Sequence, residues 1–214
     1  MLNRLRGFMT RVFTPVADVL LKLGVSPDAV TITGTLVVVV TALWAFPTGN
    51  LLVGVLVITV FVLTDSLDGV MARRAGRSGP WGAFLDSTLD RFGDAAIFGG
   101  LVLWFTAGGD DRLTAILALA CLILGSIVPY ARARAEGLGM TASGGIAERA
   151  DRLVLVLVAT GVVGMGAPVV VLTVVLGLLA LASAVTIGQR MAMVRRQTNA
   201  LTAAGPAEGD EASQ

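Results

Sequence analysis

Two long stretches without charge constrain the fold of this chain more than any other feature. No Asp, Glu, Lys or Arg occurs in residues 29–64 or in residues 153–189. A helix needs about 20 apolar residues to cross a bilayer, so each stretch is long enough for two crossings. Turn-forming residues interrupt both stretches near their middles, at residues 47–50 and 164–168. Each stretch therefore predicts two membrane spans joined by a short turn.

Two more apolar segments, residues 83–107 and 113–131, predict a third and a fourth span between these pairs. Only 14% of the 214 residues are charged, against about 25% in soluble domains, and the mean hydropathy is +0.83. The sequence therefore predicts an all-α integral membrane protein with six transmembrane helices. A nucleic-acid partner is not expected, because so apolar a chain belongs in a bilayer.

Lys and Arg are concentrated on one side of the predicted spans. Fourteen of the sixteen lie in the termini or in the connections of that side, whereas Arg112 lies in a connection on the other side and Arg91 lies within the third span. Cytoplasmic loops are enriched in Lys and Arg. Both termini are therefore expected in the cytoplasm, with the protein in the cell (inner) membrane.

The two ends of the chain differ from its apolar middle. Residues 1–22 alternate cationic with bulky apolar side chains and contain Pro15, which favours an amphipathic helix on the inner leaflet over a cleavable signal peptide. Residues 198–214 are small and acidic and are expected to form a disordered tail. We therefore expect a juxtamembrane helix over residues 1–22, a six-helix domain over 23–197 and the tail.

Two residue types that dominate enzyme chemistry are rare in this chain. There is no histidine, which excludes an imidazole base and histidine metal ligands. Cys121 is the single cysteine, so an intrachain disulfide and a cysteine-based zinc site are excluded, and we expect Cys121 in the core. Any acid–base or metal chemistry must therefore use carboxylates.

Five aspartates lie where a membrane protein rarely places them. Asp65 and Asp68 end the second predicted span, and Asp86, Asp90 and Asp94 begin the third. An aspartate at the centre of a span costs about 2.5–3.5 kcal/mol on insertion scales. Asp65 and Asp68 are three residues apart and Asp86 and Asp90 are four apart, so each pair shares a helix face. The short connection between the two spans is expected to bring both pairs to the same depth.

Four carboxylates at one depth cannot all stay ionised unless cations join them. Oxygen ligands without nitrogen or sulfur favour magnesium, manganese or calcium. Two divalent cations would balance the charge of four carboxylates. Enzymes commonly use such a pair of metal ions to catalyse displacement at phosphorus. The simpler alternative is that the aspartates are helix-end charges that pair with Arg73, Arg74 and Arg91.

These aspartates belong to a longer pattern that resembles the signature of the CDP-alcohol phosphotransferase family. Residues 65–73 and 82–90 match D-x-x-D-G-x-x-A-R and G-x-x-x-D-x-x-x-D at every fixed position. The resemblance implies a phospholipid-synthesising enzyme with the family's six-helix membrane fold. It also implies two divalent cations, Mg²⁺ or Mn²⁺, and a homodimer.

The resemblance further implies a role for each signature residue. The four carboxylates would bind metal: Asp65, Asp68, Asp86 and Asp90. Asp90 would also act as the general base, Gly69 and Arg73 would contact the CDP moiety, and Gly82 would let the two helices pack closely. Four more residues would bind the CDP-lipid: Asp28, Thr31, Ser78 and Gly79. A helix N-cap explains the motif at residues 27–31 equally well.

Arginines at three inner helix ends would suit a phosphorylated acceptor, because Arg pairs bidentately with phosphate. Those expected to hold that phosphate are Arg132, Arg134, Arg152 and Arg195. A role as topology anchors explains each of them singly. Residues 130–136 and 144–152 look most like the corresponding segments of the family's actinobacterial phosphatidylinositol phosphate synthases.

The resemblance implies transfer of diacylglycerol-phosphate from CDP-diacylglycerol to a hydroxyl of inositol phosphate, with release of CMP. A phosphatidylglycerophosphate synthase, which uses glycerol 3-phosphate, is the nearest alternative, although the acceptor-side pattern expected of it is not found. A divalent-cation transporter is a more remote alternative. It is disfavoured because the aspartates lie toward the inner face rather than at the bilayer midplane.

Overall fold

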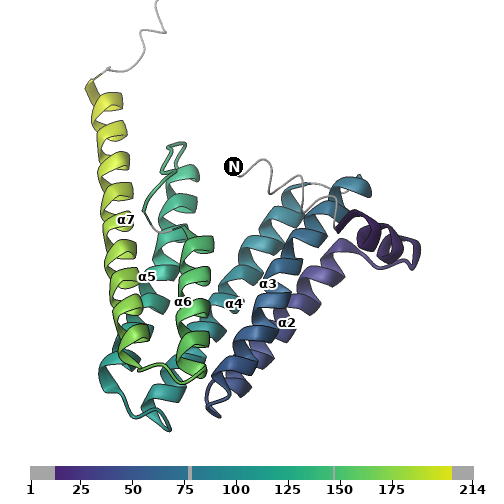
Figure 1. The fold of residues 1–214 in the computed structure, drawn as a ribbon. Helices are drawn as coiled ribbons and strands as arrows, with labels where there is room; N and C mark the ends of the chain where they lie inside the picture. Colours follow the sequence, from purple (N-terminus) through teal and green to yellow (C-terminus); the bar gives the residue numbers. More distant parts are fainter. Residues whose placement is uncertain (1–12, 77–78, 147, 204–214) are drawn as a thin grey trace, which may run out of the picture.

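The computed structural model describes residues 13–76, 79–146 and 148–203, apart from the side chains of residues 64–66 and 203 (Figure 1). A short helix over residues 13–22 precedes six longer helices. These are α2 (Pro27–Ala45), α3 (Leu51–Arg74), α4 (Pro80–Thr106), α5 (Arg112–Glu136), α6 (Arg149–Gly164) and α7 (Val170–Ala203). No strand occurs among the described residues, so the all-α prediction is confirmed.

Local sequence signals explain where these helices begin. The Ser26 hydroxyl accepts a hydrogen bond from the Ala29 amide at 3.2 Å, and Pro27 occupies the first turn, where its missing N–H costs nothing. Asp111 caps α5 in the same way through the amide of Thr114, at 2.9 Å. Short turns with a left-handed glycine, such as Gly49 at φ 76°, connect neighbouring helices.

The helices form two groups of three (Figure 1). α2 packs against both α3 and α4, and α7 packs against both α5 and α6. Contacts of α4 with α5 and of α3 with α6 join the two groups, and one apolar core runs through both. A Cβ built on Gly100 of α4 would lie 2.5 Å from the carbonyl oxygen of Ala42 in α2, so the close approach of these two helices requires glycine. The predicted burial of Cys121 is confirmed.

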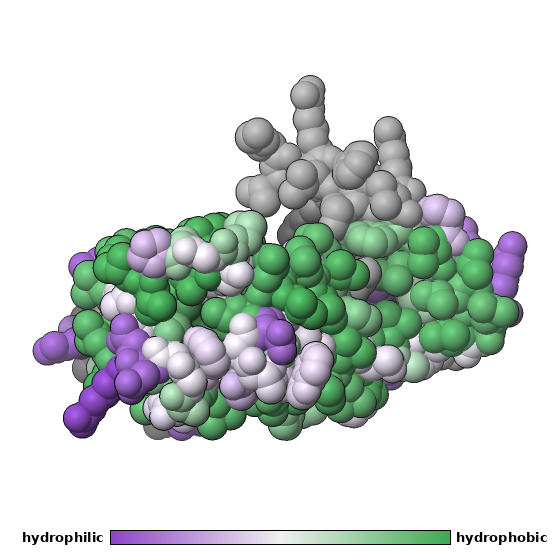
Figure 2. Space-filling model, turned by 60° about the horizontal axis from the view of Figure 1, so that its bottom comes forward, coloured by the Kyte–Doolittle hydropathy of each residue, from purple (hydrophilic) through white to green (hydrophobic). Residues whose placement is uncertain are grey.

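Apolar side chains cover much of the molecular surface, as expected for a protein surrounded by lipid (Figure 2). Four of the described helices, α2, α3, α5 and α7, are long and apolar enough to cross a membrane. α4 falls outside this group because its first half is rich in charge, and α6 because it has only 16 residues. The chain is therefore an integral membrane protein with four candidate spans by length and composition among the described residues, and the predicted count of six is not confirmed.

Both ends of the described chain are helical. In residues 13–22, Ala17 is buried against Leu67 and Met71 of α3, whereas Val16 and Val19 are exposed. Residues 1–12 of the expected juxtamembrane helix lie outside the described residues. α7 runs to Ala203, so residues 198–203 are helical rather than part of a disordered tail. The chain has no proline or glycine between Gly188 and Gly205, which explains why the helix continues.

Candidate active site

The C-terminal end of α3 and the first half of α4 hold the signature carboxylates. Asp68 is partly buried, and one of its oxygens accepts a hydrogen bond from the Thr31 hydroxyl of α2. Its other oxygen accepts from the backbone amide of Gly69. Asp86, which is exposed on α4, lies close enough to act electrostatically on Asp68. α2, α3 and α4 therefore meet at one acidic site.

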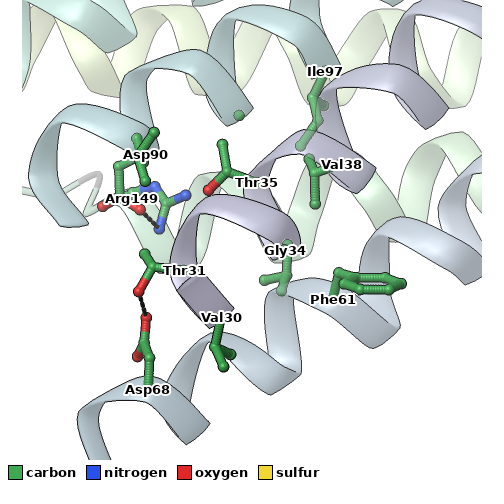
Figure 3. Close-up of a pocket in the computed structure, with 13 residues that line it drawn as sticks. Val30, Thr31, Gly34, Thr35, Val38, Phe61, Asp68, Asp90, Ile97 and Arg149 are labelled. Atoms are coloured by element: carbon green, nitrogen blue, oxygen red, sulfur yellow. Dashed lines mark hydrogen bonds and ion pairs between the residues drawn. The ribbon is translucent and has the colours of Figure 1, made fainter. Parts of the chain in front are cut away.

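A cavity of about 40 Å³ opens between these helices. Figure 3 shows Asp68 on one side of it and Asp90 with Arg149 on the other, with Thr31 and Thr35 of α2 between them. This volume accommodates a few water-sized groups but no nucleotide. A nucleotide would therefore have to approach from outside the cavity, where Asp86 is exposed.

Asp90 lies against an arginine from the other helix group. Its Oδ1 is 2.7 Å from Nη1 of Arg149, the first residue of α6. Nη2 of Arg91 lies 3.7 Å from Oδ2 of the same carboxylate. A base that faces α6 can act on a substrate held between the two helix groups, which suits the expected role of Asp90.

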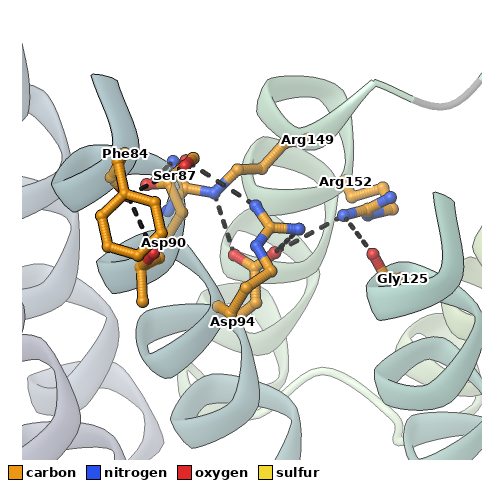
Figure 4. A network of polar contacts seen from close by, with 9 residues as sticks. Phe84, Ser87, Asp90, Asp94, Gly125, Arg149 and Arg152 are labelled. Atoms are coloured by element: carbon orange, nitrogen blue, oxygen red, sulfur yellow. Dashed lines mark hydrogen bonds and ion pairs between the residues drawn. The ribbon is translucent and has the colours of Figure 1, made fainter. Parts of the chain in front are cut away.

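Asp94, one turn further along α4, is the centre of a buried charge network (Figure 4). Its Oδ1 is 3.1 Å from Nε of Arg149, and its Oδ2 is 3.5 Å from Nη2 of Arg152 and 3.7 Å from Nη1 of Arg91. Nη2 of Arg152 also donates a hydrogen bond to the carbonyl oxygen of Gly125, at 3.2 Å. Arg152 is thus a buried cation next to the expected base.

Sequence reasoning did not assign Asp94 or Arg149 to the site. Asp94 stands four residues after Asp90, so it continues the spacing of the signature along the same face of α4. That spacing was the available signal for Asp94. No local pattern could identify Arg149, because its contact with Asp90 depends on how α6 packs beside α4.

Several expected site residues lie apart from this centre. Asp28 accepts a hydrogen bond from the indole nitrogen of Trp81 at 3.0 Å, which ties the start of α4 to the start of α2. Gly79 precedes α4 as its N-cap, while Ser78 lies outside the described residues. Arg132 pairs with Glu136 at 2.8 Å, and Arg134 and Arg195 are exposed near the ends of α5 and α7. Of the four arginines expected to hold the acceptor phosphate, only Arg152 contacts the charge network around Asp94.

Two signature glycines differ in what surrounds them. A Cβ on Gly69 would lie 3.5 Å from Nη1 of Arg73, so the Arg73 guanidinium lies over Gly69 beside the Asp68 carboxylate. A Cβ on Gly82 would have no atom of the described residues within 4 Å. The described residues therefore give no support to close helix packing at Gly82, whereas Gly100 of α4 does lie in close contact with α2.

Metal binding at this site depends on how the signature carboxylates are arranged. Among the described side chains, no three acidic or sulfur-bearing residues are close enough to form a metal site. The side chain of Asp65 lies outside this description, and Asp90 is drawn toward Arg149. Asp68 and Asp86 nevertheless provide two carboxylates in electrostatic contact, and carboxylate oxygens are donors that fit Mg²⁺ or Mn²⁺.

Comparison with known proteins gives one consistent result. The model of the CDP-alcohol phosphatidyltransferase family matches residues 24–147. A phosphatidylinositol phosphate synthase of Streptomyces avermitilis is 47% identical over 97% of this chain and 88% of its own length. One of Cutibacterium acnes is 49% identical over 92% of this chain and 98% of its own length.

Comparison with solved structures gives the same result. The crystal structure of Mycobacterium tuberculosis phosphatidylinositol phosphate synthase with CDP-DAG bound has a TM-score of 0.83 and 43% identity, covering 86% of this chain and 94% of that one. A second structure of that enzyme, in complex with manganese and citrate, has a TM-score of 0.82 and 43% identity, covering 86% and 88%.

Proposed function

The chain belongs to the CDP-alcohol phosphatidyltransferase family, and from this membership we propose that it is a phosphatidylinositol phosphate synthase. It transfers diacylglycerol-phosphate from CDP-diacylglycerol to a hydroxyl of inositol phosphate and releases CMP. One observation supports the choice of acceptor. The family model ends at residue 147, whereas the identity to phosphatidylinositol phosphate synthases extends over 92–97% of the chain and so includes α6 and α7.

The signature carboxylates hold two divalent cations, Mg²⁺ or Mn²⁺. The metal ligands are Asp65, Asp68, Asp86 and Asp90. The hydrogen bond from Thr31 to one Asp68 oxygen fixes the orientation of that carboxylate, as supporting contacts to metal ligands commonly do. When bound, the cations supply charge stabilisation to the phosphoryl group and to the departing phosphate.

Asp90 is the general base of the reaction. It accepts the proton of the acceptor hydroxyl, and the resulting oxygen attacks the lipid-bearing phosphorus while CMP departs. Its position on the side of α4 that faces α6 lets it reach an acceptor bound between the two helix groups.

The donor side of the site is built from α2, α3 and the start of α4. Gly69 has no side chain, which lets the nucleotide approach the backbone, and Arg73 above it offers guanidinium donors to the diphosphate. The remaining CDP-lipid contacts come from Asp28, Thr31, Ser78 and Gly79. The Asp28–Trp81 hydrogen bond supports this arrangement, because it fixes the start of α4 against α2.

The acceptor side draws on cations from α5, α6 and α7. The residues that hold the acceptor phosphate are Arg132, Arg134, Arg152 and Arg195. Arg152 is the strongest of these, because it is buried beside Asp94 and an ionic contact gains strength away from water. Arg132, Arg134 and Arg195 are exposed and attract the acceptor over a longer range.

All six long helices cross the membrane, with both termini and the active site in the cytoplasm. α4 and α6 are counted among the spans because each packs between helices that are long and apolar enough to cross a membrane. The helix over residues 13–22 lies along the inner leaflet, which the exposed Val16 and Val19 support. The enzyme acts as a homodimer, as the family resemblance implies.

A single assay tests the function. Purified protein in detergent receives Mg²⁺ and CDP-diacylglycerol together with inositol phosphate, glycerol 3-phosphate or unphosphorylated inositol, and the lipid product is identified by mass spectrometry. We expect phosphatidylinositol phosphate as the main product. A preference for glycerol 3-phosphate would make the enzyme a phosphatidylglycerophosphate synthase instead.

A further inference from the structure

The charge network between α4 and α6 contains more positive than negative charge. Two carboxylates, Asp90 and Asp94, face three guanidinium groups, from Arg91, Arg149 and Arg152. Asp94 and Arg152 are almost completely buried, with 8% and 2% of their surface exposed. Arg91 and Arg149 are partly exposed, so an anion could reach this excess of positive charge from solvent and balance it.

Buried hydrogen-bond donors without a partner also indicate an anion site in this network. Nε and Nη1 of Arg152 are buried without a hydrogen-bond partner among the described residues, and so is Nε of Arg91. Buried donors are nearly always satisfied in folded proteins, so unsatisfied ones commonly indicate a ligand or water site. A phosphate group offers several strong acceptors to such donors.

Arg149 connects this network to the base. Its Nε lies 3.1 Å from Asp94, while its Nη1 lies 2.7 Å from Asp90. A guanidinium has a rigid fork of donors, so it can remain on Asp94 through Nε while Nη1 exchanges one anion for another. An incoming phosphate that takes over Nη1 would release the Asp90 carboxylate.

We propose that Asp94 is a positioning residue for the phosphorylated acceptor. Its carboxylate holds Arg149 and Arg152 of α6 side by side next to Asp90. The acceptor phosphate then binds to these guanidinium groups and draws Arg149 away from Asp90, so that the base is released when the correct acceptor is present. This inference rests on the proposed function, because it assigns Asp94 to the acceptor of that reaction.

The burial and charge of Asp94 explain why this residue is needed. Without its carboxylate, three guanidinium groups would repel one another within a few ångströms of each other. Arg149 and Arg152 would then separate, and their donors would no longer converge on one phosphate. The effect should fall on the acceptor and spare the donor, because Asp68 lies across the cavity from Asp90 and Arg149.

The test compares Asp94→Asn with Asp151→Asn, a matched charge removal at an exposed position in the first turn of α6. Steady-state kinetics in detergent with Mg²⁺ give KM for each substrate. In Asp94→Asn we expect KM for inositol phosphate to rise about tenfold or more, while KM for CDP-diacylglycerol changes less than about twofold. Asp151→Asn should change neither KM.

A double variant distinguishes positioning from a general loss of structure. If Asp94 acts through Arg149, adding Asp94→Asn to Arg149→Gln should raise KM for inositol phosphate by much less than it does in the wild-type chain. Full additivity of the two effects would contradict the proposal. Equal rises of both KM values in Asp94→Asn would contradict it as well.

Asp94→Glu covers the case in which Asp94→Asn does not fold, because Glu retains the charge one methylene further out. This variant must also raise KM for inositol phosphate selectively, and an unchanged KM for that acceptor would overturn the inference. Failure of the proposed function looks different. In that case the wild-type enzyme itself would not use inositol phosphate.

Discussion

The two helix groups of this protein differ in how their functional residues are distributed along the chain. In the α2–α4 group, the signature carboxylates fall within residues 65–90 on two consecutive helices. In the α5–α7 group, the cations come from the ends of three helices and are up to about 60 residues apart. A site built on one helical hairpin can be predicted from spacing, whereas a site built across several helices depends on their packing.

The same difference separates the chemistry of the two groups. In the proposed function, the α2–α4 group carries the residues that bind metal and the activated lipid. The α5–α7 group is proposed to supply the cations that select the acceptor. Substitutions in the first group should therefore affect turnover and metal binding, and those in the second should affect KM for the acceptor.

The largest effect is expected from Asp90→Asn. This change removes the proposed base but keeps the size of the side chain, so transfer should fall by about 10²–10⁴-fold while CDP-diacylglycerol still binds. Turnover and donor binding are measured separately, with labelled CDP-diacylglycerol for the second. Asp110→Asn, in the connection between α4 and α5 at φ 40°, is a suitable control, because Asn tolerates that backbone conformation. An active Asp90→Asn enzyme would exclude Asp90 as the base.

Thr31→Val should give the next largest effect, and it should be confined to the α2–α4 group. The change removes the hydroxyl that donates to Asp68 but keeps the shape of the side chain. We expect affinity for Mn²⁺ to fall about 10–100-fold, as when other supporting contacts of metal ligands are lost. Thr35→Val, one turn further along α2 on the same cavity, is the control. A larger change in KM for inositol phosphate than in Mn²⁺ affinity would contradict the division between the two groups.

Gly100→Ala tests the packing that brings α4 against α2. The added Cβ would lie 2.5 Å from the Ala42 carbonyl oxygen, so the helices must separate, at a cost of about 1–3 kcal/mol in the free energy of unfolding. Thermal unfolding in detergent measures this loss. Gly99→Ala is a matched control on the same helix, where a Cβ has no atom within 4 Å. Equal stability of the two variants would show that the close contact at Gly100 is not required.

Arg132→Gln should give the smallest effect. Arg132 is exposed and already pairs with Glu136, so its contact with an acceptor phosphate is screened by water. We expect KM for inositol phosphate to rise only about two- to fivefold, which corresponds to an exposed charge pair. Arg112→Gln, at the opposite end of α5 from Arg132, should leave this KM unchanged. An effect of Arg132→Gln as large as that of Asp94→Asn would mean that the exposed cations, rather than the buried network, select the acceptor.

Much of the fold and the donor side of the site could be predicted from the sequence. The charge-free stretches and their central turns predicted α2, α3, α6 and α7, because a bilayer tolerates few charges in a span. The four-residue spacing of Asp86 and Asp90 predicted a shared helix face, and the signature identified both as site residues. These signals are local, so they do not depend on how distant helices pack.

The features that the sequence did not reveal all depend on tertiary packing. The Thr31–Asp68 hydrogen bond joins residues 37 positions apart, and the contact of Arg149 with Asp94 joins residues 55 apart. Arg152 was expected among the helix-end cations, yet its side chain is buried and reaches Asp94 of α4 and the Gly125 carbonyl of α5. Packing decides which of several arginines reaches the site, and no residue pattern along one helix carries that information.

The central claim is that the carboxylates of α3 and α4 bind divalent cations at one site. Crystals of the protein with Mn²⁺ and CDP-diacylglycerol, measured at the manganese absorption edge, test it directly through the anomalous difference map. We expect manganese peaks between α3 and α4 in contact with Asp68, Asp86 and Asp90. Peaks only at other positions, or no peaks in crystals of protein that is active with Mn²⁺, would contradict the claim.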